Sequence, residues 1–157
     1  MLRRIVGPLV ATAALVAAAP AVAGGPFHGT FGPDTVSFVD TDTCGFPIEQ
    51  TQTESGDFTV YFKDGVRTKA IVHNSFEATL SANGKTLVER DRWNSTFYGE
   101  ASEVGEVDEG SLVHIHGPGN LVIHEAGRIV SIPTGTISYM TGRHPDVVGA
   151  ICAALAP

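Results

Sequence analysis

Basic residues are scarce in this chain. Its 157 residues include 10 Lys and Arg against 17 Asp and Glu, which gives a net charge of −7. Nucleic acids and anionic membrane surfaces attract proteins through clustered Lys and Arg. This charge balance therefore argues against nucleic acid and anionic membrane surfaces as partners.

Long apolar runs are missing beyond the first 23 residues. Residues 5–19 form an apolar stretch behind Arg3 and Arg4, and Ala21-Val22-Ala23 supplies a small-x-small cleavage site. We therefore expect residues 1–23 to be a signal peptide and residues 24–157 to be a single secreted, extracellular domain. No later run approaches the roughly 18 apolar residues of a membrane span. Removal of the first 23 residues leaves 134, with eight basic and 17 acidic side chains and a net charge of −9.

Familiar catalytic signatures are also absent. The chain contains no Gly-x-Ser-x-Gly, no His-Glu-x-x-His and no phosphate-cradling glycine loop. The sequence therefore assigns no catalytic residue, and it favours a protein that is not an enzyme.

Cysteine is rare, because Cys44 and Cys152 are the only two. In a secreted chain such a pair most simply forms a disulfide, and the alternative is two free buried thiols. The bond would close a loop of 109 residues, counting both cysteines. The chain-entropy estimate for a loop of that length is about 4–5 kcal/mol of stabilisation.

Strand-like segments, in contrast, are frequent and closely spaced. Asn83-Gly84 and Asp64-Gly65 mark tight turns between neighbouring segments. We predict an all-β protein, an antiparallel up-and-down barrel or strongly curled sheet of about eight strands. The expected strands are residues 35–40, 48–53, 58–63, 67–73, 76–81, 85–93, 96–100, 103–107, the two arms of a hairpin within 111–130, 129–131 and 136–140.

The last segment has a different period. Pro145 suits the first turn of a helix, and an apolar stripe follows it. A helix of about ten residues is unstable alone, so we expect a short C-terminal helix docked on the sheet. The stripe consists of Val147, Val148, Ile151, Cys152 and Leu155.

The clearest hairpin is Ser111–Val130, which holds half of the six histidines. If facing residue numbers add up to an even value, as for His114 and His124, one face is apolar and the other carries His114, His116 and His124. An odd sum, from a two-residue Pro118-Gly119 turn, would mix the faces. Because burial of one face specifies register, we favour the even sum with a longer Gly-Pro-Gly loop.

Three imidazoles on one face allow two interpretations. His114, His116 and His124 can form a three-nitrogen zinc or copper site with an open position for water, or they can be an ordinary polar surface. Glu125 and Arg128 are expected near the same face as acid, base or anion clamp. Arg128 also suits a structural ion pair.

Five short motifs are spread over the chain: Thr43-Cys44-Gly45-Phe46-Pro47, Gly117-Pro118-Gly119, Ala126-Gly127-Arg128-Ile129-Val130, Gly142-Arg143-His144 and Ile151-Cys152-Ala153-Ala154-Leu155. Together they resemble those of a group of uncharacterised small secreted proteins of actinobacteria. The resemblance implies a β-barrel-like fold and a Cys44–Cys152 disulfide, and it carries over no catalytic residue. The likeness to allene-oxide-cyclase and dirigent-type barrels is one of architecture only.

These patterns predict a secreted small β-barrel protein that binds a small apolar ligand or a cell-envelope component without catalysis. Two alternatives stay open: a His- or metal-dependent isomerase or hydrolase that uses the three histidines, and a purely structural extracellular protein. Five aromatic side chains are candidates for the ligand site, although the sequence does not assign them to the inside or the outside. They are Phe58, Tyr61, Phe62, Phe97 and Tyr98.

Overall fold

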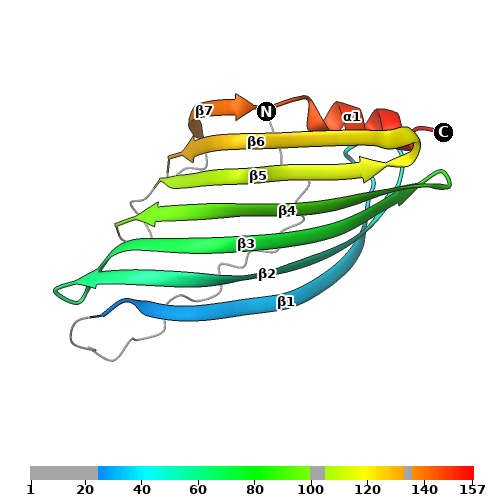
Figure 1. Ribbon diagram of the computed structural model, residues 1–157. Helices are drawn as coiled ribbons and strands as arrows, with labels where there is room; N and C mark the ends of the chain where they lie inside the picture. Colours follow the sequence, from blue (N-terminus) through cyan, green and yellow to red (C-terminus); the bar gives the residue numbers. More distant parts are fainter. Residues whose placement is uncertain (1–24, 100–104, 133–135) are drawn as a thin grey trace.

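The computed structural model describes residues 25–99, 105–132 and 136–157. Seven antiparallel strands lie side by side in one sheet in sequence order, and one short helix follows them (Figure 1). The expected signal peptide, residues 1–23, lies outside the described residues. The elements are β1 (Phe27–Asp40), β2 (Ile48–Lys63), β3 (Val66–Ala82), β4 (Lys85–Tyr98), β5 (Glu106–Gly117), the 3₁₀ turn η1 (Pro118–Asn120), β6 (Leu121–Ser131), β7 (Ile137–Arg143) and α1 (Val147–Leu155).

The all-β class, the up-and-down strand order and the C-terminal helix are confirmed. Of the two predicted forms, a barrel or a curled sheet, the barrel is wrong because the sheet is not closed. The sheet has seven strands instead of about eight, and its edge strands β1 and β7 do not pair with each other. No helix in the described part of the chain is long and apolar enough to cross a membrane.

The strands are longer than the sequence patterns predict. β2 runs through both residues 48–53 and 58–63, and β3 runs through both 67–73 and 76–81. The segment Glu54-Ser55-Gly56-Asp57 has the composition of a turn, yet each of its residues pairs with a residue of β3. Pairing with neighbouring strands outweighs the weak local preference for a turn. Parts of the expected strands 96–100 and 103–107 lie outside the described residues.

A row of cross-strand partners rich in glycine runs across the sheet and explains why the strands can bend. Gly110 of β5 pairs with Gly127 of β6, which pairs in turn with Gly142 of β7. A Cβ atom at Gly127 would lie 2.1 Å from the carbonyl oxygen of Thr141, and its φ of 151° suits glycine. Glycines at such positions let strands kink and a sheet curve, and the strands in Figure 1 bow along their length.

The hydrophobic core lies between one face of the sheet and α1, and we call this face the inner face. Ile48, Leu87 and Ile115 are fully buried there, and Leu155 of the helix is fully buried against them. Full burial of each such side chain contributes about 1.5–3 kcal/mol. α1 lies at the end of the sheet that carries the β3–β4 and β5–β6 turns (Figure 1). The main cluster of core side chains therefore lies at this end of the inner face.

Three contacts hold the helix in place. The Asp146 side chain caps its first turn by accepting a hydrogen bond from the Gly149 backbone N–H at 3.0 Å. At its other end, the Asn83 side chain in the β3–β4 turn donates to the Leu155 carbonyl oxygen at 2.8 Å. Cys152 forms the expected disulfide with Cys44 in the loop before β2. The helix is thus tied to the β3–β4 turn and to the loop before β2.

Candidate functional site

The β5–β6 hairpin has the predicted register. His114 faces His124, and the sum of facing residue numbers is even from Val113–Glu125 to Gly117–Leu121. The three-residue turn η1 makes this possible, because Gly119 and Asn120 both adopt positive φ. The apolar side chains of the hairpin therefore join the core on the inner face, and the histidines lie on the opposite, outer face.

The three outer-face histidines form a close cluster. The ring centre of His114 lies 4.5 Å from that of His116 and 5.3 Å from that of His124, both edge to face. Partial burial, followed by the charges of His116 and His124, lowers the pKa of His114. Among the described residues no group of three or more His, Cys, Asp or Glu side chains is arranged to hold a metal ion. The zinc or copper site stays a prediction.

Glu125 and Arg128 do not share a face, contrary to expectation. Arg128 is on the outer face and forms an ion pair with Glu109 at 3.3 Å, so the structural interpretation of this arginine holds. Glu125 has the same parity as Ile123, and its side chain is buried on the inner face. We expected Glu125 near the histidines because it is adjacent to His124, but adjacent residues of a strand point to opposite faces.

A β-bulge at Leu112 determines which residues of β5 face inward. Ser111 and Val113 of β5 flank this extra residue, while their partners Ala126 and Glu125 are consecutive in β6. The pairing with β4 shifts at the same point. An extra residue reverses the alternation of side chains. Ile115 and Val113 face inward on one side of the bulge, and Asp108 faces inward on the other.

All six buried polar side chains in the described part of the chain lie on the inner face. They come from four strands, they lie beyond the apolar core, and three of them are acidic. We call this set the polar belt. Its members are Gln50, Gln52, Asp91, Ser95, Asp108 and Glu125.

One part of the belt is a hydrogen-bond network around Ser95. The Ser95 hydroxyl donates to the Asp108 carboxylate at 2.5 Å and accepts from the Trp93 indole N–H and the Asn74 amide, each at 3.2 Å. On β2, the Gln52 side chain donates a hydrogen bond to the Gln50 side chain at 3.0 Å. These bonds orient the belt side chains across three strands.

A second part of the belt is Asp91, whose carboxyl group pairs with that of its neighbour Glu89. Burial, the charge of Asp91 and a hydrogen bond with Asp91 raise the pKa of Glu89 to about 9. Glu89 is therefore protonated at neutral pH and donates its proton to the Asp91 carboxylate. Asp91 also accepts the backbone N–H of His114 at 2.6 Å, a donor that the bulge removes from the regular β4–β5 pairing.

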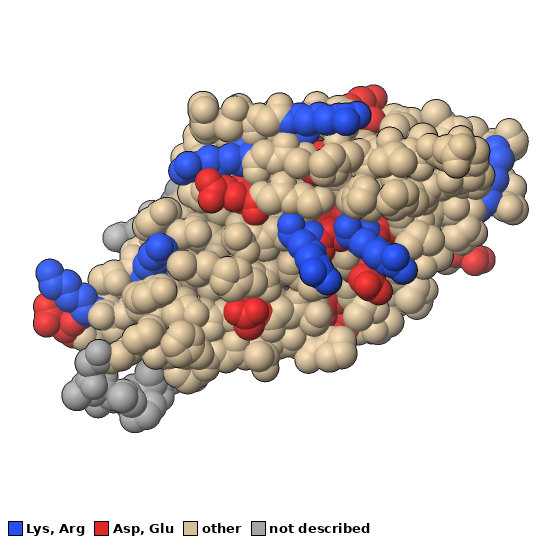
Figure 2. Space-filling model, viewed as in Figure 1, with Lys and Arg blue, Asp and Glu red and all other residues tan. Residues whose placement is uncertain are grey.

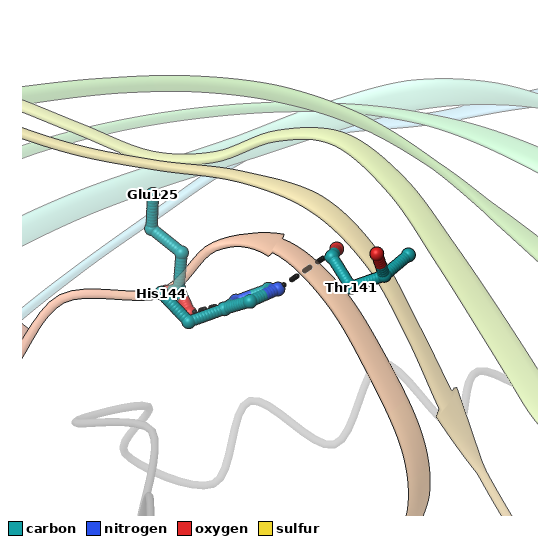
Figure 3. A network of polar contacts seen from close by, with 3 residues as sticks. All are labelled: Glu125, Thr141 and His144. Carbon is teal, nitrogen blue, oxygen red and sulfur yellow. Dashed lines mark hydrogen bonds and ion pairs between the residues drawn. The ribbon is translucent and has the colours of Figure 1, made fainter.

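The third part connects the sheet to the segment before α1. The Glu125 carboxylate lies 2.9 Å from Nδ1 of His144, and Nε2 of His144 lies 3.0 Å from the Thr141 carbonyl oxygen (Figure 3). Burial alone would lower the pKa of His144, but the bonds to Glu125 and Thr141 outweigh burial and raise it. Glu125 is thus held by a partner that can carry a positive charge.

The aromatic candidates separate by face. Phe58 and Phe97 occupy inner-face positions. Phe58 lies two residues before the buried Val60 in the same strand, and Phe97 pairs with the buried Ala70. Tyr61 and Tyr98 are exposed and occupy outer-face positions. Phe62 has inner-face parity at the far end of β2, where it is 42% exposed.

The sequence did not predict the polar belt, because its members are spread over residues 50–125 and match no local motif.

No family model, no curated protein and no solved structure matches this chain. The geometry of the two faces of the sheet therefore provides the evidence on function.

Proposed function

We propose that the protein is a secreted, non-enzymatic binding protein. Its inner face binds a small ligand that carries a positively charged group. The observation that carries this proposal is the polar belt, in which Asp91, Asp108 and Glu125 are each at most 4% exposed. Burial of polar and charged groups costs free energy, and apolar side chains would fill the same positions more cheaply. A binding role accounts for their presence.

The charge of the inner face supports a cationic ligand. In the described strands, Lys and Arg occur at inner-face positions only near the ends, as Lys85 beside the helix and Arg67 at the far end. The ionisable side chains between them are carboxyl groups, Glu54, Glu89, Asp91, Glu106, Asp108 and Glu125 among them. Carboxylates in a partly buried site attract and orient an amine or guanidine group.

The ligand also needs an apolar part. Phe58 and Phe97 occupy inner-face positions beyond the belt, on the side away from α1. The sequence led us to expect a small apolar ligand, and the belt adds a charged group to that expectation. The secretory localisation belongs to the same proposal: a disulfide suits an oxidising compartment, and residues 1–23 have the pattern of a signal peptide.

Calorimetric titration of the purified protein with octylamine and with octanoate tests the proposal, since the two probes share an alkyl chain and differ in charge. We expect octylamine to bind and octanoate not to bind. Asp108→Asn should weaken octylamine binding about tenfold, because it removes a buried charge. Asp57→Asn, on the exposed outer face of β2, is the matched control and should change binding less than twofold.

Equal binding of both probes would contradict the assigned charge, and no binding of either would contradict the proposed function. Loss of octylamine binding in both variants would assign the attraction to overall charge instead of to the belt.

A further inference from the structure

The outer face carries a hollow of about 330 Å³ beside the histidine cluster. It lies where the bulge at Leu112 interrupts the pairing of β4 and β5, between the pairs Glu89–Ile115 and Arg92–Ser111. The separation of the two strands there explains the hollow. Basic and acidic side chains lie close together over the middle of the sheet in Figure 2. The polar residues of its lining are Ser75, Glu77, Arg90, Asp91, Arg92, Ser111 and His114.

Two rows of cross-strand neighbours form this hollow. In the first row Arg92 of β4 pairs with Ser75 of β3 and with Ser111 of β5, so that a serine occupies the neighbouring position on each side of Arg92. In the second row Arg90 pairs with Glu77 of β3. The two arginines are two residues apart in one strand and therefore share the outer face, about 6.5–7 Å apart along the strand.

The carboxylates around the hollow are engaged elsewhere. Glu77 forms an ion pair with Arg90 at 3.8 Å, and Glu109 forms one with Arg128 at 3.3 Å. Asp91 accepts the His114 backbone N–H. The Arg92 side chain has no ion pair or hydrogen bond with any residue that the structure describes. The positive charge of Arg92 is therefore available to a ligand.

The histidine cluster lies at one side of the hollow. His114 borders the hollow, and His116 and His124 lie beside it. On β3, His73 lies one position further along the outer face and is bonded to Asn94 at 2.6 Å. The ring N–H groups of the cluster can donate hydrogen bonds to a bound anion.

We propose that the hollow binds a small oxyanion, such as a phosphate, sulfate or carboxylate group, with Arg92 as its main ligand and Ser75, Ser111, Arg90 and His114 around it. Arginine and hydroxyl donors together suit the tetrahedral oxygens of a phosphate or sulfate group. The net charge of −7 opposes attraction of a long polyanion, so the ligand is a single anionic group on a small molecule. Asp91 of the belt also borders this site, but the other polar lining residues lie on the outer face, and the proposal does not depend on the function of the belt.

The test is a titration with inorganic phosphate at constant ionic strength, followed by NMR of the imidazole ¹H–¹⁵N signals. We expect saturable shifts at His114. Arg92→Gln should weaken binding about tenfold. The matched control is Arg128→Gln, which removes the same charge from the same face and should change binding less than twofold.

Glycerol 3-phosphate, titrated separately, distinguishes free phosphate from a phosphate ester as the source of the group, since the tighter ligand identifies the source. Unchanged affinity in Arg92→Gln would overturn the proposal. Equal weakening in both variants would overturn it as well, because it would show attraction by overall charge. A thermal unfolding curve of each variant establishes that it is folded.

Discussion

At the scale of single residues, the pair Glu125–His144 shows how strongly a buried group depends on its partner. The two side chains are 3% and 9% exposed and meet at 2.9 Å. Replacement of one partner leaves the other buried without its bond, which costs more than the bond contributes. This contact also connects the polar belt to the segment that leads into the helix.

His144→Gln should destabilise the protein by about 1–3 kcal/mol. The raised pKa of folded His144 means that its charged form stabilises the fold. That contribution is complete below the unfolded pKa of about 6.5 and is lost as pH rises through the folded pKa. Urea unfolding should therefore show a larger difference between wild type and variant at pH 6 than at pH 9. His28→Gln, at an exposed histidine of β1, is the control; a difference that grows with pH would contradict this assignment.

The metal interpretation of the histidine cluster is tested at the same scale. A zinc site requires three ring nitrogens about 2.0–2.1 Å from one point, whereas these rings meet edge to face. We expect wild type and His114→Ala to bind zinc with the same weak affinity in a competition assay with a chelating dye. Tighter binding by the wild type would establish the metal site and support the alternative of a metal-dependent enzyme.

At the scale of elements, two devices hold the sheet in its shape: the disulfide that ties α1 to the loop before β2, and the glycine pairing of β5, β6 and β7. The disulfide joins segments distant in sequence, since the cysteines are 108 residues apart, whereas the glycines pair consecutive strands. A helix of 9 residues is too short to be stable without such contacts.

Removal of the disulfide should loosen this end of the molecule. We expect the variant Cys44→Ser/Cys152→Ser to lose about 2–5 kcal/mol of unfolding free energy, since the unfolded chain regains the entropy of a long loop. Urea unfolding of the oxidised protein, the reduced protein and the variant provides the measurement. Equal stability of all three would show that packing alone holds the helix.

Gly127→Ala should destabilise the pairing of β6 with β7. The added Cβ would lie 2.1 Å from the Thr141 carbonyl oxygen, and the backbone cannot yield without breaking the pairing. We expect a loss of about 2–3 kcal/mol, measured by urea unfolding. Gly25→Ala is the control, because a Cβ there meets no atom within 4 Å. A neutral Gly127→Ala would refute the argument from close approach.

At the scale of the whole molecule, the two faces of the sheet carry different sets of charged groups, although Glu77 and Glu109 also lie on the outer face. Carboxyl groups dominate the inner face, while Arg90, Arg92 and the histidine cluster lie on the outer face. Each proposed ligand therefore has the charge opposite to that of its face. A variant at one face should leave binding at the other unchanged.

The proposed export is also tested at the scale of the whole chain. We expect the protein recovered outside the cell to begin at Gly24, as found by N-terminal sequencing. Ala23→Phe should block this cleavage, since the position before the cut requires a small residue. Ala19→Phe keeps the small-x-small site and should be processed normally. Recovery of the intact chain inside the cell alone would contradict secretion.

Several features followed from the sequence alone because their causes are local. Alternation of apolar and polar residues around Ile115 and Ile123 specified the hairpin register, since any other register would bury histidines. The apolar stripe after Pro145 specified the helix, and a pair of cysteines specified the disulfide. The register and the helix depended on neighbouring residues, and two cysteines allow only one pairing.

The tertiary structure decided what local patterns leave open. The extra residue at Leu112 reverses the faces of β5 and turns Asp108 inward, and no local pattern marks it because bulges depend on pairing with two neighbouring strands. The open edges at β1 and β7 depend on the curvature accumulated over seven strands. The polar belt and the outer hollow exist only once residues 50–125 are paired, because strand pairing brings side chains together that are far apart in sequence.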